Sequence, residues 1–138
     1  MKRIIALLVI ILGSAFSYGY YLFHKPHQGV ANKEAAYTME SRQLFNEFDQ
    51  NESMANKKYL GKVVCVSGRV ADKAVDAKGS FSLILEGGEM AGVGCQFDKS
   101  VLKEVETIKK GQVIKVKGVC TGMLMDVVLV DCVTEDAD

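Results

Sequence analysis

The stretch KKGQVIKVKGVCTGMLMDVVLVDCV, residues 109–133, decides the fold that the sequence predicts. It contains two runs rich in β-branched and aliphatic residues, 113–120 and 127–133, joined by a longer loop, so it predicts an antiparallel hairpin. In the first run the even-numbered positions carry no charge, whereas both lysines, Lys115 and Lys117, are odd-numbered. One face of the strand is therefore expected to be buried and the other solvated. Because a lone hairpin is marginal in water, partner strands are needed upstream.

Three upstream segments supply those partner strands: residues 62–73, 80–85 and 92–97. Residues 98–108 then carry apolar side chains at helical spacing, with Asp98 as a candidate N-cap. Three strands, a helix and two strands form the plan of an OB-fold barrel. Gly68 lies in the middle of the longest strand, where we expect a bulge or a sharp bend.

Residues 41–58 predict a helix before the barrel. Leu44, Phe45 and Phe48 gather on one side of it, and Gly61 ends it just before the first barrel strand. We expect this amphipathic helix to pack on its own barrel. The predicted fold class is thus all-β with accessory helices: a five-stranded OB-fold barrel preceded by an amphipathic helix and an N-terminal transmembrane helix.

The N-terminal segment predicts export. Residues 4–23 contain no charge and are long enough to cross a bilayer as a helix. Lys2 and Arg3 precede them, so the N-terminus is expected in the cytoplasm and the rest outside, as a single-pass protein of the bacterial inner membrane with a periplasmic or extracellular domain. The alternative is a signal peptide cleaved near Ala15-Phe16-Ser17, which predicts a secreted protein.

These features divide the chain into three parts. We expect an anchor or signal in residues 1–25, a linker in residues 26–40, and an exported domain, including the amphipathic helix, in residues 41–138. The only histidines, His24 and His27, lie in or beside the linker with no further ligand nearby. We therefore predict neither a metal site nor a cofactor.

The charge of the domain argues against nucleic acid as a partner. From Val30 onward there are 14 basic and 17 acidic residues, a net charge of −3. Such a domain lacks the broad positive field that attracts phosphate backbones, and Glu86 and Glu89 add negative charge to the loop after the second barrel strand. Phe81 and Phe97 alternate in phase with core residues, so they are not expected to stack on bases.

Two groups of residues are candidates for binding. Lys115 and Lys117 form a basic strip, for which a solvated strand edge is the competing interpretation. Met123, Leu124 and Met125 stand together at the tip of the last hairpin. They either fold over the barrel mouth as a lid or form a soft contact patch for a partner or lipid.

Three stretches also resemble a known family: KYLGKVVCVSGRV (58–70), GVGCQF (92–97) and KKGQVIKVKGVCTGMLMDVVLVDC (109–132). Together they are similar to the tRNA-anticodon-like OB-fold proteins, exported bacterial proteins commonly labelled as lipoproteins. The resemblance spans about residues 44–133 and implies the OB fold, but it transfers no active site. No cysteine lies near the N-terminal segment for lipid attachment, which departs from the lipoprotein label and favours a protein anchor.

The four cysteines, Cys65, Cys95, Cys120 and Cys132, are spread over four predicted strands without a CxxC pair. That spacing disfavours zinc knuckles and thioredoxin-like centres. In an oxidising compartment an even number of cysteines permits disulfides. The topology of the expected barrel favours Cys95 with Cys132 and Cys65 with Cys120. Four buried free thiols are the alternative.

Catalysis has little support, because without a histidine in the domain neither a Ser/His nor a Cys/His pair can form. We therefore expect no enzyme. The leading hypothesis is a non-catalytic binding or scaffold module in the cell envelope, attached to the membrane by its N-terminal helix, with an envelope protein or small ligand as partner. The alternative is an OB domain that binds oligonucleotides or other nucleic acid.

Overall fold

The computed structural model describes residues 2–23 and 29–136; in the first helix, side chains are described for Ile4 and residues 10–20. His24 and His27 lie outside the described residues. Among the described residues, no helix is both long enough and apolar enough to span a membrane. The elements are α1 (Lys2–Phe23), η1 (Val30–Asn32), β1 (Tyr37–Glu40), α2 (Ser41–Gln50), α3 (Glu52–Tyr59), β2 (Val63–Val75), β3 (Phe81–Glu86), β4 (Gly92–Phe97), η2 (Lys99–Val101), α4 (Leu102–Glu106), β5 (Val113–Met123) and β6 (Val127–Glu135).

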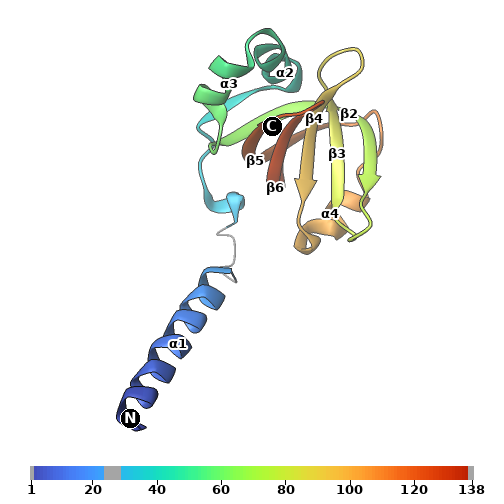
Figure 1. Cartoon of the computed structure of the whole chain (residues 1–138). Coiled ribbons are helices and arrows are strands. Elements are labelled where there is room, and N and C mark those ends of the chain that lie inside the picture. Colours follow the sequence, from blue (N-terminus) through green and yellow to red (C-terminus); the bar gives the residue numbers. More distant parts are fainter. Residues whose placement is uncertain (1, 24–28, 137–138) are drawn as a thin grey trace.

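The predicted five-stranded barrel with accessory helices is confirmed. The strands pair in the order β2, β3, β4, β6, β5, and pairing of β5 with β2 closes the ring. All neighbours are antiparallel except β4 and β6, which are parallel. Figure 1 shows α2 and α4 at opposite ends of the barrel. The inward side chains form one core, which α2 covers with Leu44 and Phe48 and the α4 segment with Val105 and Ile108.

Strand β2 changes partner along its length. Its first half, Val63 to Arg69, hydrogen-bonds to β5, and its second half, from Val70 onward, hydrogen-bonds to β3. The irregularity predicted at Gly68 lies instead between Val70 and Asp72, where the register with β3 shifts. Glycine is required at position 68 for another reason: a Cβ there would lie 2.2 Å from Ser41 Oγ. This close approach lets the Ser41 hydroxyl donate a 2.5 Å hydrogen bond to the Glu86 carbonyl.

The predicted linker, residues 26–40, is largely part of the folded domain. Residues Tyr37–Glu40 form β1, which pairs in parallel with Val64–Ser67 of β2. Before it, Val30 of η1 is buried, and the Ala36 amide donates to the Val63 carbonyl at 2.8 Å. Period and composition did not reveal β1 because it is only four residues long and lies on the edge of the sheet.

The helix predicted for residues 41–58 is two helices that meet at Asn51. The Asn51 side chain accepts from the Met54 amide at 3.1 Å and so caps α3 as a new helix. Glu47 of α2 ties the two helices together, because its carboxylate accepts from the Tyr59 hydroxyl at 2.6 Å and from Lys58 at 3.0 Å. These bonds, the one from Tyr59 foremost, lower the pKa of Glu47.

Substituting Gly68 by alanine should destabilise the fold because the new methyl group overlaps Ser41 Oγ. We expect the free energy of unfolding to fall by about 1–3 kcal/mol, the usual cost of overpacking. In a Ser41→Gly background the same substitution should cost less, because the overlapping atoms are gone. Denaturant titrations of the four proteins in this cycle measure the difference.

Gly94→Ala, in strand β4, is the matched control. A Cβ at position 94 meets its nearest atoms at 3.9 Å, an ordinary contact distance, so this substitution should leave stability nearly unchanged. Equal losses for both alanine variants, or no relief from Ser41→Gly, would show that the close approach of Ser41 is not the cause.

Candidate binding groove

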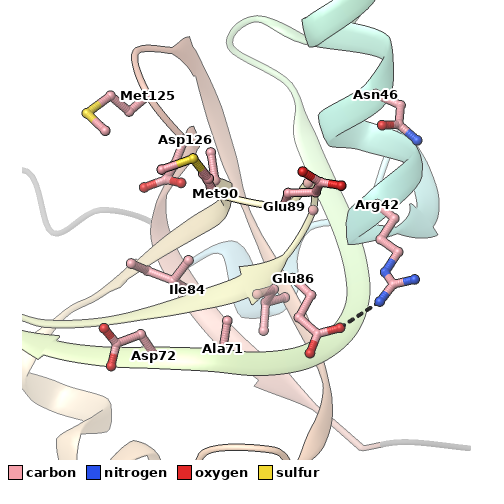
Figure 2. A pocket seen from close by; sticks show the side chains of 14 residues that line it. Arg42, Asn46, Ala71, Asp72, Ile84, Glu86, Glu89, Met90, Met125 and Asp126 are labelled. Carbon is pink, nitrogen blue, oxygen red and sulfur yellow. Dashed lines mark hydrogen bonds and ion pairs between the residues drawn. The ribbon is translucent and has the colours of Figure 1, made fainter.

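A groove of about 850 Å³ lies against the outer surface of the barrel. Its floor is formed by β2 and β3, where Asp72 and Ile84 are cross-strand neighbours. The start of α2 lines one side with Arg42 and Asn46. The remaining walls are the loop 87–91, between β3 and β4, and the 124–126 tip of the last hairpin (Figure 2). Four separate parts of the chain therefore meet in this groove.

Local contacts hold the loop 87–91 in place. Gly87 and Gly88 pack so closely on Phe45 of α2 that a Cβ on either would lie within 3.0 Å of the ring or its Cβ. The Gly88 amide also donates to the Ala91 carbonyl at 2.7 Å. Glycine is needed at both positions because any larger residue would clash with Phe45. The backbone of the loop therefore packs directly on the helix.

The hairpin tip is fixed to the same loop. The Gly92 amide donates to Asp126 Oδ1 at 2.7 Å, and within the tip the Leu124 amide donates to the Asp126 carbonyl at 3.1 Å. Asp126 thus joins the two loops that form the far walls of the groove. Hydrogen bonds within the chain therefore hold both walls in place.

The charge of the groove is negative. Its only lining cation, Arg42, donates to Glu86 at 2.8 Å, and Arg69 lies 3.9 Å from the other Glu86 oxygen. Glu86 is therefore neutralised within the protein. Asp72, Glu89 and Asp126 supply three further carboxylates without a lining cation to offset them. Asp72 accepts from the Lys73 backbone amide at 2.8 Å, and its ion pair with Lys110 is long, 3.9 Å, and exposed, so its charge is only weakly neutralised.

The rim of the groove is apolar. Met90 is 97% exposed and Met125 is 78% exposed, and Leu124 beside it is 90% exposed. Figure 2 shows Met90 next to Asp126 and Met125 farther out on the hairpin tip. The lid expected from Met123, Leu124 and Met125 is therefore wrong for the last two. Only Met123 packs against the core, while the other two side chains are exposed, and a contact patch for a partner or lipid stays a prediction.

Lys115 and Lys117 lie elsewhere and do not form a solvated basic strip. Lys117 is only 7% exposed, and its ammonium group donates to Glu135 at 2.6 Å and to the Ala31 carbonyl at 3.2 Å. Lys115 lies 4.0 Å from the same carboxylate. β5 is not an edge strand, because it is paired on both sides. The two lysines therefore hold η1 and Glu135 on the barrel and are not available as a binding surface.

The register separates two of the cysteines that were expected to pair. Cys65 is opposite Lys117, on the outward face, and its thiol donates to Glu135 at 3.4 Å. Cys120 is opposite Leu129, in the core. Cross-strand neighbours share a face, so Cys65 and Cys120 point to opposite sides of the sheet and their predicted pairing is wrong.

The other predicted pair is adjacent. Cys95 on β4 and Cys132 on β6 both face the core, and the two strands are paired in parallel. Burial, followed by the neighbouring Cys95 thiol, raises the pKa of Cys132 well above its ordinary value. All four cysteines are free thiols in this structure, so a Cys95–Cys132 disulfide stays a prediction.

Within residues 2–23 and 29–136, no group of three or more His, Cys, Asp or Glu side chains is placed to hold a metal ion.

The sequence predicted only part of the groove. Met125 and the negative charge of Glu86 and Glu89 were noted, but Arg42 and Asp72 were not. Those two are far from the loops in sequence, and nothing in their local pattern indicates that the fold brings them together.

The fold and the groove together define the class: a small OB-fold barrel with a preformed, acidic surface groove. The chain belongs to the tRNA_anti-like family, whose model matches residues 1–134. The comparison with curated proteins gave no match.

Among solved structures, the chain is similar to a lipoprotein from Klebsiella pneumoniae that was named as a candidate nucleic-acid-binding protein. The identity is 21%, the TM-score is 0.60, and the match covers 71% of this chain and 91% of that one. The Stn1–Ten1 complex of S. pombe matches with 17% identity and a TM-score of 0.44 over 54% of this chain and 59% of that one. An OBody bound to hen egg-white lysozyme matches with 14% identity and a TM-score of 0.45, over 59% and 88%. At these identities, the first match shows a shared fold.

Disulfide mapping tests the cysteine assignment. When the full chain is purified without reductant and alkylated, we expect a Cys95–Cys132 bridge and free Cys65 and Cys120. Cleavage at aspartate separates Cys120 from Cys132, since Asp126 lies between them. Alkylation of Cys65 should be slow at neutral pH, because burial raises its pKa to about 11. A Cys65–Cys120 bridge would contradict the register described above.

The Lys117–Glu135 contact makes stability depend on pH. The pKa of Glu135 is lowered in the folded state, mainly by the hydrogen bond that Lys117 donates to it. Ionised Glu135 therefore stabilises the fold above its ordinary unfolded pKa, and this stabilisation is lost as the pH falls through the lowered folded value. We expect Glu135→Gln to reduce the free energy of unfolding by about 1 kcal/mol at neutral pH, and by much less in acid.

Urea titrations at neutral and acidic pH measure this effect. Glu34→Gln is the control, because Glu34 is an exposed carboxylate in the N-terminal segment that Lys117 contacts through Ala31. It should change stability little at either pH. A loss in Glu135→Gln that is the same at both values would assign the effect to packing and not to charge.

Proposed function

We propose that this protein is a non-catalytic binding or scaffold module of the cell envelope, whose groove contacts an envelope protein or a small ligand. The observation that carries the proposal is the groove itself: a concave, preformed site with a few polar groups and an exposed apolar rim. Binding sites share these properties. Exposed apolar side chains on fixed loops are also typical of surfaces that contact a partner.

We further propose that residues 1–25 hold the domain at the outer face of the inner membrane, or act as a cleaved signal. Support comes from the uncharged run of residues 4–23 behind Lys2 and Arg3. The Klebsiella pneumoniae relative is described as a lipoprotein, which supports association with the envelope.

A binding role without catalysis is supported by the state of the reactive groups. No histidine follows His27 in the sequence. The four thiols are buried, and burial raises the pKa of Cys65 and Cys120, so both are kept in the protonated, unreactive form. Two of the groove carboxylates have ordinary structural partners: Glu86 pairs with Arg42, and Asp126 accepts from the Gly92 amide.

The alternative function is nucleic-acid binding, which the description of the Klebsiella pneumoniae relative favours. The charges weigh against it, because the groove carries three carboxylates that Arg42 does not neutralise, and Lys115 and Lys117 are engaged by Glu135. Phosphate backbones are bound by accessible cations. Retention of the full chain on single-stranded DNA that weakens steeply with salt would favour this alternative.

Photo-crosslinking in cells tests the proposed function. A photoreactive residue in place of Met125 should give a discrete adduct with an envelope protein or ligand, because this position lies on the exposed rim of the groove. The control is the same residue in place of Met54, which is also exposed but lies on α3, outside the groove. Adducts that are identical at both positions, or only bulk lipid at Met125, would remove the support for a binding groove.

A further inference from the structure

We propose that the groove binds a partner segment in which lysine or arginine side chains stand next to apolar ones. This inference rests on the proposed function and assigns the chemistry of its partner. It combines three properties of the same surface: an excess of negative charge, an apolar rim and floor, and walls fixed in the free protein.

The excess of negative charge selects a cationic group. Arg42 is used internally by Glu86, so it does not attract an anion. Asp72, Glu89 and Asp126 then set the sign of the potential in the groove, and a concave surface with one sign of charge concentrates its field. Asp126 has one oxygen bound to the Gly92 amide, and Glu89 extends from an exposed loop. A lysine or arginine of the partner can approach both from solvent.

The apolar surface selects a protein segment over a free cation. Ile84 lies beside Asp72 on the floor, and Met90 and Met125 stand on the rim beside Glu89 and Asp126 (Figure 2). Acidic and apolar side chains thus alternate over the same surface. Methionine side chains are flexible and polarisable, so they fit apolar groups of different shape. A segment that carries both kinds of side chain satisfies the whole surface, whereas a polyamine or a metal ion would leave the methionines in water.

The fixed walls reduce what binding would cost. Phe45 packs on Gly87 and Gly88, and the Gly92 amide joins the two loops through Asp126. Contacts within the chain thus fix both loops, so little conformational entropy should be lost in ordering them on binding. Like charge excludes the phosphate backbone of a nucleic acid from the same place, and it also repels an anionic lipid surface.

Methionine-methyl NMR of the full chain in an uncharged detergent tests this inference. A short peptide alternating lysine and valine should shift the Met90 and Met125 methyl signals, and should leave that of Met54 in place. Raising the ionic strength should weaken the effect. The peptide with glutamate in place of lysine, and an oligothymidylate, should cause no shift at either position.

Charge variants locate the interaction. Asp72→Asn with Glu89→Gln removes two carboxylates and keeps the side-chain shapes, and should weaken binding of the lysine peptide about three- to tenfold. The matched control is Asp49→Asn with Glu104→Gln, two exposed carboxylates that do not line the groove, which should leave the affinity unchanged. No shift at Met90 and Met125, an equal response to the glutamate peptide or the oligothymidylate, or equal losses in both double variants would overturn the inference.

The crosslink at position 125 separates this inference from the proposed function. If the adduct forms and Asp72→Asn with Glu89→Gln reduces its yield, both stand. If the adduct forms and the double variant leaves its yield unchanged, the groove has a partner but that partner is not recognised by its positive charge, and only the inference fails. If no adduct specific to position 125 forms, the proposed function fails as well.

Discussion

The hydrogen bond from Ser41 to the Glu86 carbonyl fixes the start of α2 on the barrel, and the groove depends on this position of the helix. It exists because Gly68 has no side chain, so the start of α2 can lie against β2 and reach the end of β3. The contact fixes where α2 begins, and it thereby places Arg42 next to the Glu86 carboxylate and Phe45 under the loop 87–91. The groove is a consequence of how the helix is seated and not of any one loop.

The N-terminal region is held on the barrel by different interactions. Lys117 is almost fully buried, and it is tolerated because Glu135 and the Ala31 carbonyl satisfy it. The same cluster contains Cys65, whose thiol donates to Glu135. With β1 added to β2, the folded domain begins near Val30, earlier than the amphipathic helix. Only the short stretch 24–28 separates α1 from the first described residue of the domain.

The OB fold does not determine which ligand a protein binds, because the side chains on its surface do. A shared barrel with the Klebsiella pneumoniae lipoprotein therefore carries no ligand from one protein to the other. The charged groups that line the groove are acidic or, as in Arg42, already paired, and Lys117 is engaged by Glu135. The exposed methionines and the carboxylates without a lining cation are the observations from which we propose a positively charged, partly apolar partner.

Local pattern determined the strands and their order. Alternation of polar and apolar residues found β2 to β6 within a few residues of their ends, and Asp98 was recognised as the cap of the helix between them. These features depend on residues that are close in sequence, so the sequence alone predicts them. The same holds for the apolar face of α2, although the break at Asn51 was missed because its side chain caps a second helix.

Tertiary structure alone decided which of those residues serve a site. Lys117 looked solvated because it alternates with core residues, but η1 covers that outward face, and residues 30–32 carried no periodic signal. Cys65 and Cys120 were expected to pair, but the register puts them on opposite faces of the sheet. Arg42, Asp72 and Met90 meet only when α2, β2 and a loop come together in space. The periodicity of the sequence indicates on which face of its strand or helix a side chain lies. It does not indicate which other segment of the chain covers that face.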